Sequence, residues 1–201
     1  MVQSMAKKKR TKMAVGAGMM ALLLGLGICA GYEANNTGYK VSEMKSTYCL
    51  DVNDMSAVVG DVDYVFVGKV EKNIDTVYKY PVEVKGETVT TPYTNYSVSV
   101  IKDIKGDLPE GKTIEIQKAG GISEDGKTYF VYENDVIVDE GGYYVMLAYA
   151  QPDGSLLMSG ANSTLKTGKL FKDSKIFQKV EKSYLNEKKT ERKRFKFLEK
   201  K

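Results

Sequence analysis

The sequence predicts a mainly β domain, a small barrel or sandwich, between an N-terminal apolar helix and a C-terminal helix. Three observations predict this class. Residues 13–32 carry no charge, residues 55–173 alternate short Val- and Tyr-rich runs with Gly and Pro, and residues 174–201 are rich in helix formers. We divide the chain into a signal peptide or membrane anchor (1–32), a linker (33–54), the β domain (55–173) and a basic helix or tail (174–201).

The uncharged run of residues 13–32 follows five Lys or Arg residues within the first twelve. A helix that rises about 1.5 Å per residue makes this run just long enough to cross a hydrocarbon core of about 30 Å. Cations before an apolar run stay in the cytoplasm, so the residues after it are delivered outside. We expect an extracytoplasmic bacterial protein, membrane-anchored or secreted, whose N-terminal segment has the membrane as its partner.

The end of this run leaves three outcomes open. Leu26 and Cys29 match a bacterial lipoprotein signal, in which the Cys is lipidated, although Ile28 stands where such signals have a small residue. Cleavage after Ala30 suits an ordinary signal peptidase, and an uncut helix would leave a tether. Cys29 is our candidate lipidation site, and an inert apolar Cys is the alternative.

The composition excludes several kinds of chemistry. The chain has two Cys and no His. Because one Cys lies in the apolar run, we expect no disulfide framework. The lack of His excludes Ser-His pairs, Cys-His pairs and imidazole metal ligands. The acidic runs lack the spacing of EF-hand calcium loops and predict a solvated face, so we expect no metal site and no cofactor.

The net charge of +4 is unevenly distributed along the chain. Residues 1–12 carry +5 and residues 174–201 carry +7, which leaves −8 for residues 13–173. An acidic domain is a poor ligand for polyanions, so we expect no nucleic-acid partner. The basic C-terminal residues have two interpretations, contact with anionic lipids or wall polyanions and a frayed soluble end, and we favour the second.

The elements of the β domain follow from alternation and turn residues. Residues 58–70, rich in Val and aromatics, predict a buried strand after one short helical turn around residues 54–59. The following stretch contains Pro81 and Gly86 and ends at Pro92, which predicts a loose hairpin or insertion.

Residues 93–105 are the clearest predicted strand. One face holds Tyr96, Val98 and Val100, and the other holds Asn95, Ser97 and Ser99. A Gly- and Pro-containing turn over residues 106–111 and renewed alternation at residues 114–116 predict a hairpin. Further strands are predicted at residues 129–132, 136–138, 143–149 and 156–158, with Gly or Pro between them. Ser174 predicts the N-cap of a helix that is docked at first and solvated later.

Three segments carry a family resemblance: DVDYVFVGKV, YSVSVIKDIKGDLPEGKTIEIQKAGG, and VDEGGYYVMLAY with the following QPDGSLLMSG. Over residues 55–170 the chain resembles the domain of bacterial cell-surface proteins that is similar to the OB-fold of tissue inhibitors of metalloproteinases and netrin modules. The resemblance implies a small OB-like closed β-barrel. It does not imply protease inhibition, because the disulfide-linked N-terminal Cys of the animal inhibitors is not matched here.

The fourteen Tyr residues suggest a ligand-binding face. OB-type barrels bind extended ligands across one sheet face between the loops at its rim. Four Tyr cluster around the irregular stretch and are our candidate ligand-binding residues: Tyr78, Tyr80, Tyr93 and Tyr96. A cell-wall glycan or a surface protein would suit such a face. The alternative is that these Tyr residues fill half-buried strand positions.

Two S-x-x-K motifs, Ser99 to Lys102 and Ser163 to Lys166, are the catalytic candidates. In a strand, residues three apart point to opposite sides, so we interpret both as surface polar residues and assign no catalytic residue. The sequence thus predicts a non-enzymatic, extracytoplasmic, membrane-tethered interaction module of a bacterial cell surface. The alternatives are a Ser-Lys hydrolase and a secreted inhibitor of an extracellular enzyme.

Overall fold

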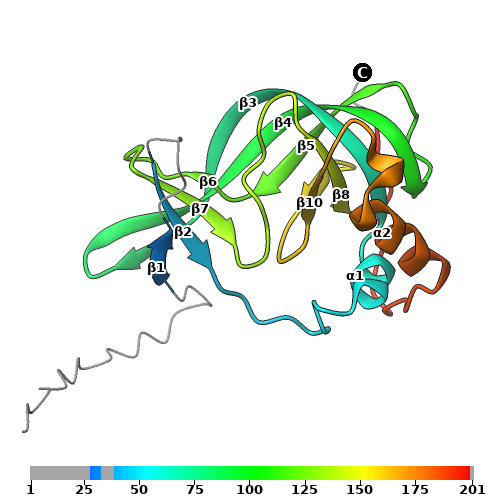
Figure 1. Ribbon diagram of the computed structural model, residues 1–201. Coiled ribbons are helices and arrows are strands. Elements are labelled where there is room, and N and C mark those ends of the chain that lie inside the picture. Colours follow the sequence, from blue (N-terminus) through cyan, green and yellow to red (C-terminus); the bar gives the residue numbers. More distant parts are fainter. Residues whose placement is uncertain (1–27, 33–38, 200–201) are drawn as a thin grey trace, which may run out of the picture.

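The computed structural model describes residues 28–32 and 39–199, and it is mainly β with a helix near the C-terminus (Figure 1). A four-stranded sheet has the order β1-β2-β7-β6, and a six-stranded sheet has the order β10-β8-β3-β4-β5-β9. The strands of the first are β1 (Ile28–Tyr32), β2 (Lys40–Met44), β6 (Gly121–Ile122) and β7 (Thr128–Tyr132). Those of the second are β3 (Tyr64–Val84), β4 (Glu87–Lys105), β5 (Thr113–Ala119), β8 (Tyr143–Ala150), β9 (Leu156–Met158) and β10 (Thr164–Thr167).

Five strands of the larger sheet form a closed circuit of pairings. β3 pairs with β4 and β8, β5 pairs with β4 and β9, and β8 pairs with β9. All these pairings are antiparallel except β5 with β9. We call β3, β4, β5, β9 and β8 the strand ring. Its interior is filled by large side chains that are at most 1% exposed, among them Phe66, Tyr96, Tyr144, Met146 and Leu156.

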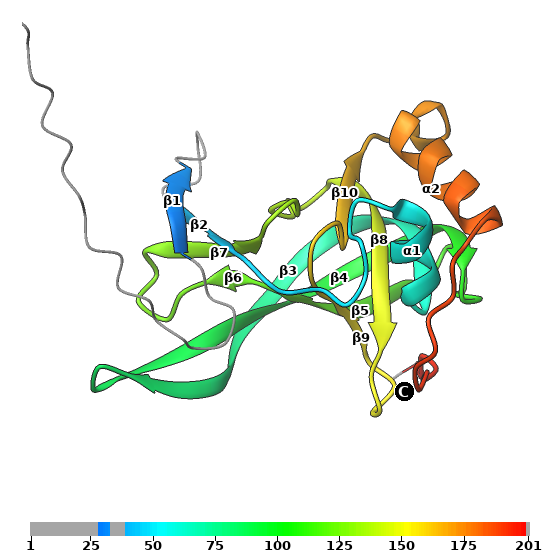
Figure 2. The same ribbon diagram turned by 90° about the horizontal axis from the view of Figure 1, so that it is seen from below.

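Two helices cover the outer side of β3 and β8 at the end opposite the hairpin tip (Figure 2). They are α1 (Met55–Asp61) and α2 (Lys175–Leu185). Val65 and Val67 pack in one cluster with residues of these helices, while Phe66 points into the ring, so residues 64–68 at the start of β3 are buried on both faces. Burial on both faces explains why these first five residues of β3 include no charged side chain.

The longest elements are β3 and β4, which form one hairpin that projects beyond the strand ring (Figures 1 and 2). The turn residues Lys85 and Gly86 both have positive φ, 53° and 84°, as a type I′ turn requires. Of the two predicted alternatives, a loose hairpin and an insertion, the structure shows the hairpin, which extends two long strands. Tyr80, with φ of 54°, lies at an irregularity of the register between Lys79 and Val82.

Several local predictions are confirmed. In β4, Tyr96, Val98 and Val100 are 1%, 0% and 0% exposed, and the intervening residues lie on the other face. The short helical turn is α1. Ser174 caps α2, and its Oγ accepts the N–H groups of Ile176 and Phe177 at 3.2 and 3.5 Å.

Other local predictions are wrong. Residues 136–138 form a loop that pairs with no strand. Val138 is nevertheless buried, as its apolar side chain would suggest. The predicted linker contains β2, which pairs in parallel with β7. Ile28–Tyr32, predicted as the end of the apolar helix, is strand β1. The rest of that run lies outside the described residues, and in the part that is described no helix has the length and apolarity needed to span a membrane.

The C-terminal residues after α2 are also not the solvated end that we expected. Residues 188–199, which we call the strap, are irregular in conformation and lie against α1 and the strand ring. Arg192 and Arg194 donate to backbone carbonyls at the end of α1, while Phe195 and Phe197 pack against the ring's core cluster. Two effects stabilise the strap in this position. The α1 carbonyls gain hydrogen-bond donors that the helix does not supply, and the two Phe rings lose contact with water.

Candidate functional site

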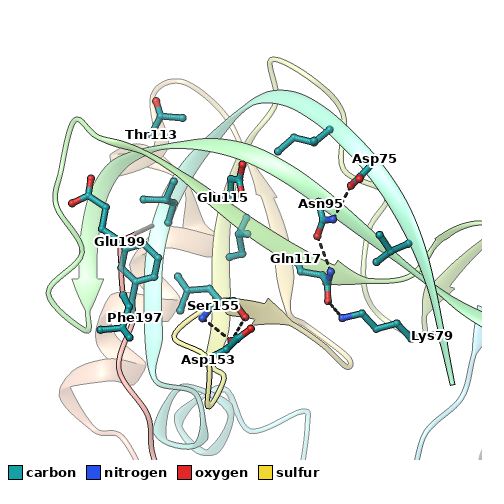
Figure 3. Close-up of a pocket in the computed structure, with 16 residues that line it drawn as sticks. Asp75, Lys79, Asn95, Thr113, Glu115, Gln117, Asp153, Ser155, Phe197 and Glu199 are labelled. Carbon is teal, nitrogen blue, oxygen red and sulfur yellow. Dashed lines mark hydrogen bonds between the residues drawn. The ribbon is translucent and has the colours of Figure 1, made fainter. Parts of the chain in front are cut away.

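A groove of about 700 Å³ lies on the outer face of β3, β4 and β5 (Figure 3). Its floor comes from β3 residues between positions 74 and 79, from Asn95 of β4 and from residues 113–117 of β5. One wall is the β8–β9 turn, with Asp153 and Ser155, and another is the end of the strap, with Phe197, Leu198 and Glu199. The groove therefore combines segments that are far apart in the sequence.

A row of four hydrogen-bonded side chains crosses the groove floor, and we call it the polar ladder. Asn95 Nδ2 donates to Asp75 Oδ1 at 2.7 Å, and Gln117 Nε2 donates to Asn95 Oδ1 at 2.7 Å. Lys79 Nζ donates to Gln117 Oε1 at 2.6 Å. Figure 3 shows the four side chains joined in this order.

The strand register produces this ladder. Asn95 in β4 is paired with Asp75 in β3 and with Gln117 in β5. Directly opposed residues on one face of a sheet lie within side-chain reach. Because their amide and carboxylate groups bond one another, the ladder presents fixed donors and acceptors to a ligand.

The groove is acidic. Among the described residues that line it, four carry carboxylates, Asp75, Glu115, Asp153 and Glu199, and one, Lys79, carries a cation. Asp153 Oδ1 accepts the N–H and the hydroxyl of Ser155 at 3.0 and 2.6 Å, which fixes the β8–β9 turn. A polyanion would be repelled by this set of charges, whereas neutral polar groups meet many hydrogen-bonding partners.

The strap wall is fixed by two backbone hydrogen bonds. Phe197 N–H donates to the Tyr64 hydroxyl at 2.8 Å, and Leu198 N–H donates to the Gly154 carbonyl at 3.0 Å. A Cβ on Gly154 would lie 2.6 Å from Leu198, so only glycine permits this approach. The strap and the β8–β9 turn therefore form one continuous rim.

Of the four predicted Tyr residues, the structure brings two together. The rings of Tyr80 and Tyr93 meet edge to face with centroids 6.0 Å apart, and Lys79 Nζ lies 4.8 Å from the Tyr93 ring centroid. Lys79 therefore connects this aromatic pair to the polar ladder. Tyr80 is 68% exposed, and partial burial raises the pKa of Tyr93 to about 12.

The other two predicted Tyr residues lie elsewhere. Tyr78 is 37% exposed on the projecting hairpin. Tyr96 is 1% exposed and faces the interior of the strand ring, where its hydroxyl lies 3.3 Å from that of Tyr129. Burial raises the pKa of Tyr96. This side chain belongs to the core and does not face the groove.

The two S-x-x-K motifs have other partners. Ser99 Oγ donates to Glu71 at 2.8 Å, and Lys102 donates to Glu110 at 2.7 Å. Ser163 Oγ donates to Asp135 at 2.6 Å, and Lys166 donates to Asp139 at 3.2 Å. In neither motif is the Ser hydrogen-bonded to its own Lys.

The two Cys residues and the acidic runs add little to the site. Cys29 lies in β1, and its side chain is outside the described residues, so its lipidation stays a prediction. Cys49 is an exposed free thiol. Within residues 28–32 and 39–199, no three Cys, Asp or Glu side chains are grouped closely enough to hold a metal ion.

Sequence reasoning missed the polar ladder. It also missed Lys118, which is 2% exposed and pairs with Asp135 inside the domain, although signals for both were present. Asn95 belongs to the polar face of the best-predicted strand, but its partners on β3 and β5 depend on register. Lys118 continues the inward alternation of Ile114 and Ile116, so the period of two places it inside.

Comparisons with protein-family models and with curated proteins find no match to this chain.

Proposed function

We propose that the protein is a non-enzymatic, extracytoplasmic binding module, tethered to a bacterial membrane, whose groove holds an extended cell-wall glycan. The polar ladder is the observation that carries this proposal. Asp75, Asn95, Gln117 and Lys79 present carboxylate, amide and ammonium groups in a row across three strands. Such a row suits the repeated hydroxyl and amide groups of a sugar chain.

The finer fold assignment belongs to the same proposal: the strand ring is an OB-like closed barrel. Two features of the five-stranded ring support it. The first strand, β3, pairs with the second, β4, and with the fourth, β8, and the pairing of β5 with β9 is parallel. In OB-folds, oligosaccharides and oligonucleotides bind across the second and third strands, between two rim loops. The groove occupies the corresponding face, on β4 and β5 beside the β8–β9 turn.

Charge decides between these two ligand classes. The described residues of the groove carry four carboxylates and one ammonium group, so an oligonucleotide would meet repulsion from them, and we propose no nucleic-acid partner. The exposed Tyr80, in contact with Tyr93, supplies an aromatic face beside the ladder. A sugar ring can pack its apolar face on such a surface while its hydroxyl groups bond the ladder.

The membrane tether in this proposal is the N-terminal segment alone. A lipid-binding role for the basic C-terminal residues is disfavoured because two of its cations are used within the fold. Arg192 and Arg194 bond the end of α1 and form ion pairs with Asp63 at 2.7 and 3.0 Å.

The test is binding of the full chain to purified peptidoglycan sacculi stripped of teichoic acid, measured by co-sedimentation. We expect the double variant Asn95→Ala, Gln117→Ala to bind about tenfold or more weakly, since each lost hydrogen bond is worth about 1 kcal/mol. Gln178→Ala, an exposed amide on α2, is the matched control and should bind as the wild type does.

Three results would contradict the proposal. Wild-type protein that does not sediment with sacculi removes the glycan ligand, and a double variant that binds normally removes the groove. Release of soluble sugar fragments by the wild type would indicate an enzyme. Labelling of Ser99 or Ser163 by a serine-reactive probe would then favour the Ser-Lys hydrolase.

A further inference from the structure

A buried polar cluster joins three distant parts of the chain. Lys118 is near the end of β5, Asp135 lies in the loop after β7, and Ser163 and Thr164 stand at the start of β10. The side chains of Lys118 and Asp135 are 2% and 0% exposed. Neither the groove nor the proposed glycan site uses any of these residues.

The geometry brings an amine against a carboxyl group. Lys118 Nζ lies 2.5 Å from Asp135 Oδ2, 2.8 Å from Thr164 Oγ1 and 3.3 Å from Ser163 Oγ. The other carboxyl oxygen, Asp135 Oδ1, accepts the backbone N–H groups of Val136 and Thr164 at 2.9 and 3.0 Å. Two N–H groups directed at one oxygen resemble an oxyanion hole.

The surroundings also favour the neutral form of the amine. Burial lowers the pKa of Lys118, and the charge of Asp135 opposes this shift. With bulk water excluded, transfer of one proton from the ammonium group to the carboxylate gives a neutral amine beside a carboxylic acid. A neutral amine is a nucleophile, and the acid carbon is its electrophile.

We propose that Lys118 and Asp135 are joined by an intramolecular amide bond that forms in the folded domain with loss of one water molecule. The bond ties β5 to the loop between β7 and β8. It gives the domain a covalent cross-link that does not depend on paired Cys residues.

The reaction balances without a co-reactant. Lys118 Nζ attacks Asp135 Cγ, and the N–H groups of Val136 and Thr164 stabilise the negative charge that develops on Oδ1. The Nζ–Cγ bond forms and the Cγ–Oδ2 bond breaks. Ser163 Oγ, 2.6 Å from Oδ2, relays protons to that oxygen. Of the three ammonium protons, two leave in the water and one stays on the amide nitrogen.

Tryptic peptide mapping of the purified full chain by mass spectrometry tests this proposal. Trypsin does not cleave after an acylated lysine, so we expect residues 113–127 as one peptide, cut at Lys112 and Lys127 but not at Lys118. That peptide should be linked to residues 128–166, which contain no other Lys or Arg before Lys166. The linked species should weigh about 18 Da less than the two peptides together.

Lys118→Arg is the matched control, because arginine keeps the positive charge and does not form the amide. Trypsin should cleave this variant after position 118 and give residues 113–118, 119–127 and 128–166 as separate peptides with no loss of water. Dehydration at an Asp-Gly step would also lower the mass of one peptide, but it would not link two peptides. Fragment ions must therefore show that the bond joins Lys118 to Asp135. Separate, unmodified peptides from the wild type would overturn the proposal and leave an ion pair.

Discussion

Arg194 and Asp63 are 131 residues apart in the sequence and form an ion pair of 3.0 Å. The same guanidinium group donates to the carbonyl oxygens of Gly60, Asp61 and Val62. It therefore satisfies the end of α1, where helical carbonyls have no partner within the helix and a cation is favoured by the helix dipole. The strap is a structural part of the domain for this reason.

Replacing Arg194 by Ala should lower the free energy of unfolding by about 1–2 kcal/mol, because the α1 carbonyls lose a charged donor. Arg192 still pairs with Asp63, which limits the loss. Arg194→Lys keeps the charge without the planar fork and should fall between wild type and Arg194→Ala. Urea unfolding measures all three, and wild-type stability for Arg194→Ala would contradict the role assigned to the strap.

Gly68 of β3 lies directly against side chains of the ring's core cluster. A Cβ at this position would be 2.6 Å from Val98 Cγ1 and 2.9 Å from Met146 Sδ. Gly68→Ala should therefore destabilise the domain by about 1–3 kcal/mol through overpacking. Gly168→Ala is the control, since nothing lies within 4 Å of its added Cβ. Equal melting temperatures for the two variants would show that the ring interior is less tightly packed than described.

The buried Tyr96 predicts a loss of stability in alkali. Its pKa is raised in the folded protein by burial, so its contribution is fully present below the unfolded value of 10.0 and is lost as the pH rises above it. Tyr96→Phe removes this dependence. The difference in unfolding free energy between wild type and Tyr96→Phe should shrink between pH 8 and about pH 11. A constant difference across that range would mean that Tyr96 ionises equally in both states.

The ion pair between Lys105 and Glu187 fastens the chain after α2 to the end of β4. Their nitrogen and oxygen are 2.7 Å apart, and the two side chains are 12% and 14% exposed. Burial lowers the pKa of Lys105, so this amine depends on its acceptors, Glu187 and the Val59 carbonyl. Glu187→Gln should cost about 1–3 kcal/mol of stability. The exposed Glu191→Gln should cost almost nothing in the same urea titration.

Local features could be predicted from the sequence because they depend on neighbouring residues. The alternation around Tyr96 and Val98 identified both faces of β4, and Ser174 identified the start of α2. The pairing of β2 with β7 could not be predicted, since it depends on a partner about 90 residues away in a parallel arrangement that local patterns do not encode.

The candidate site was predictable only in part, for the same reason. The cluster of Tyr residues directed attention to the β3–β4 hairpin, where Tyr80 and Tyr93 contact each other, and their role in ligand binding stays a prediction. The polar ladder requires the register of three strands, and a shift of one residue would turn Asn95 away from the groove. The strap wall requires Phe197 and Leu198 to bond Tyr64 and Gly154, which helix propensity alone does not predict.

The strap also affects when the domain can finish folding. The contacts that close α1 and the groove rim come from Arg194, Phe197 and Leu198, and each of them bonds a residue much earlier in the sequence. Contacts between residues so distant in sequence form late and slowly. The domain therefore reaches its final structure only after the strap has left the ribosome, and truncation before Arg194 would remove this donor from the end of α1.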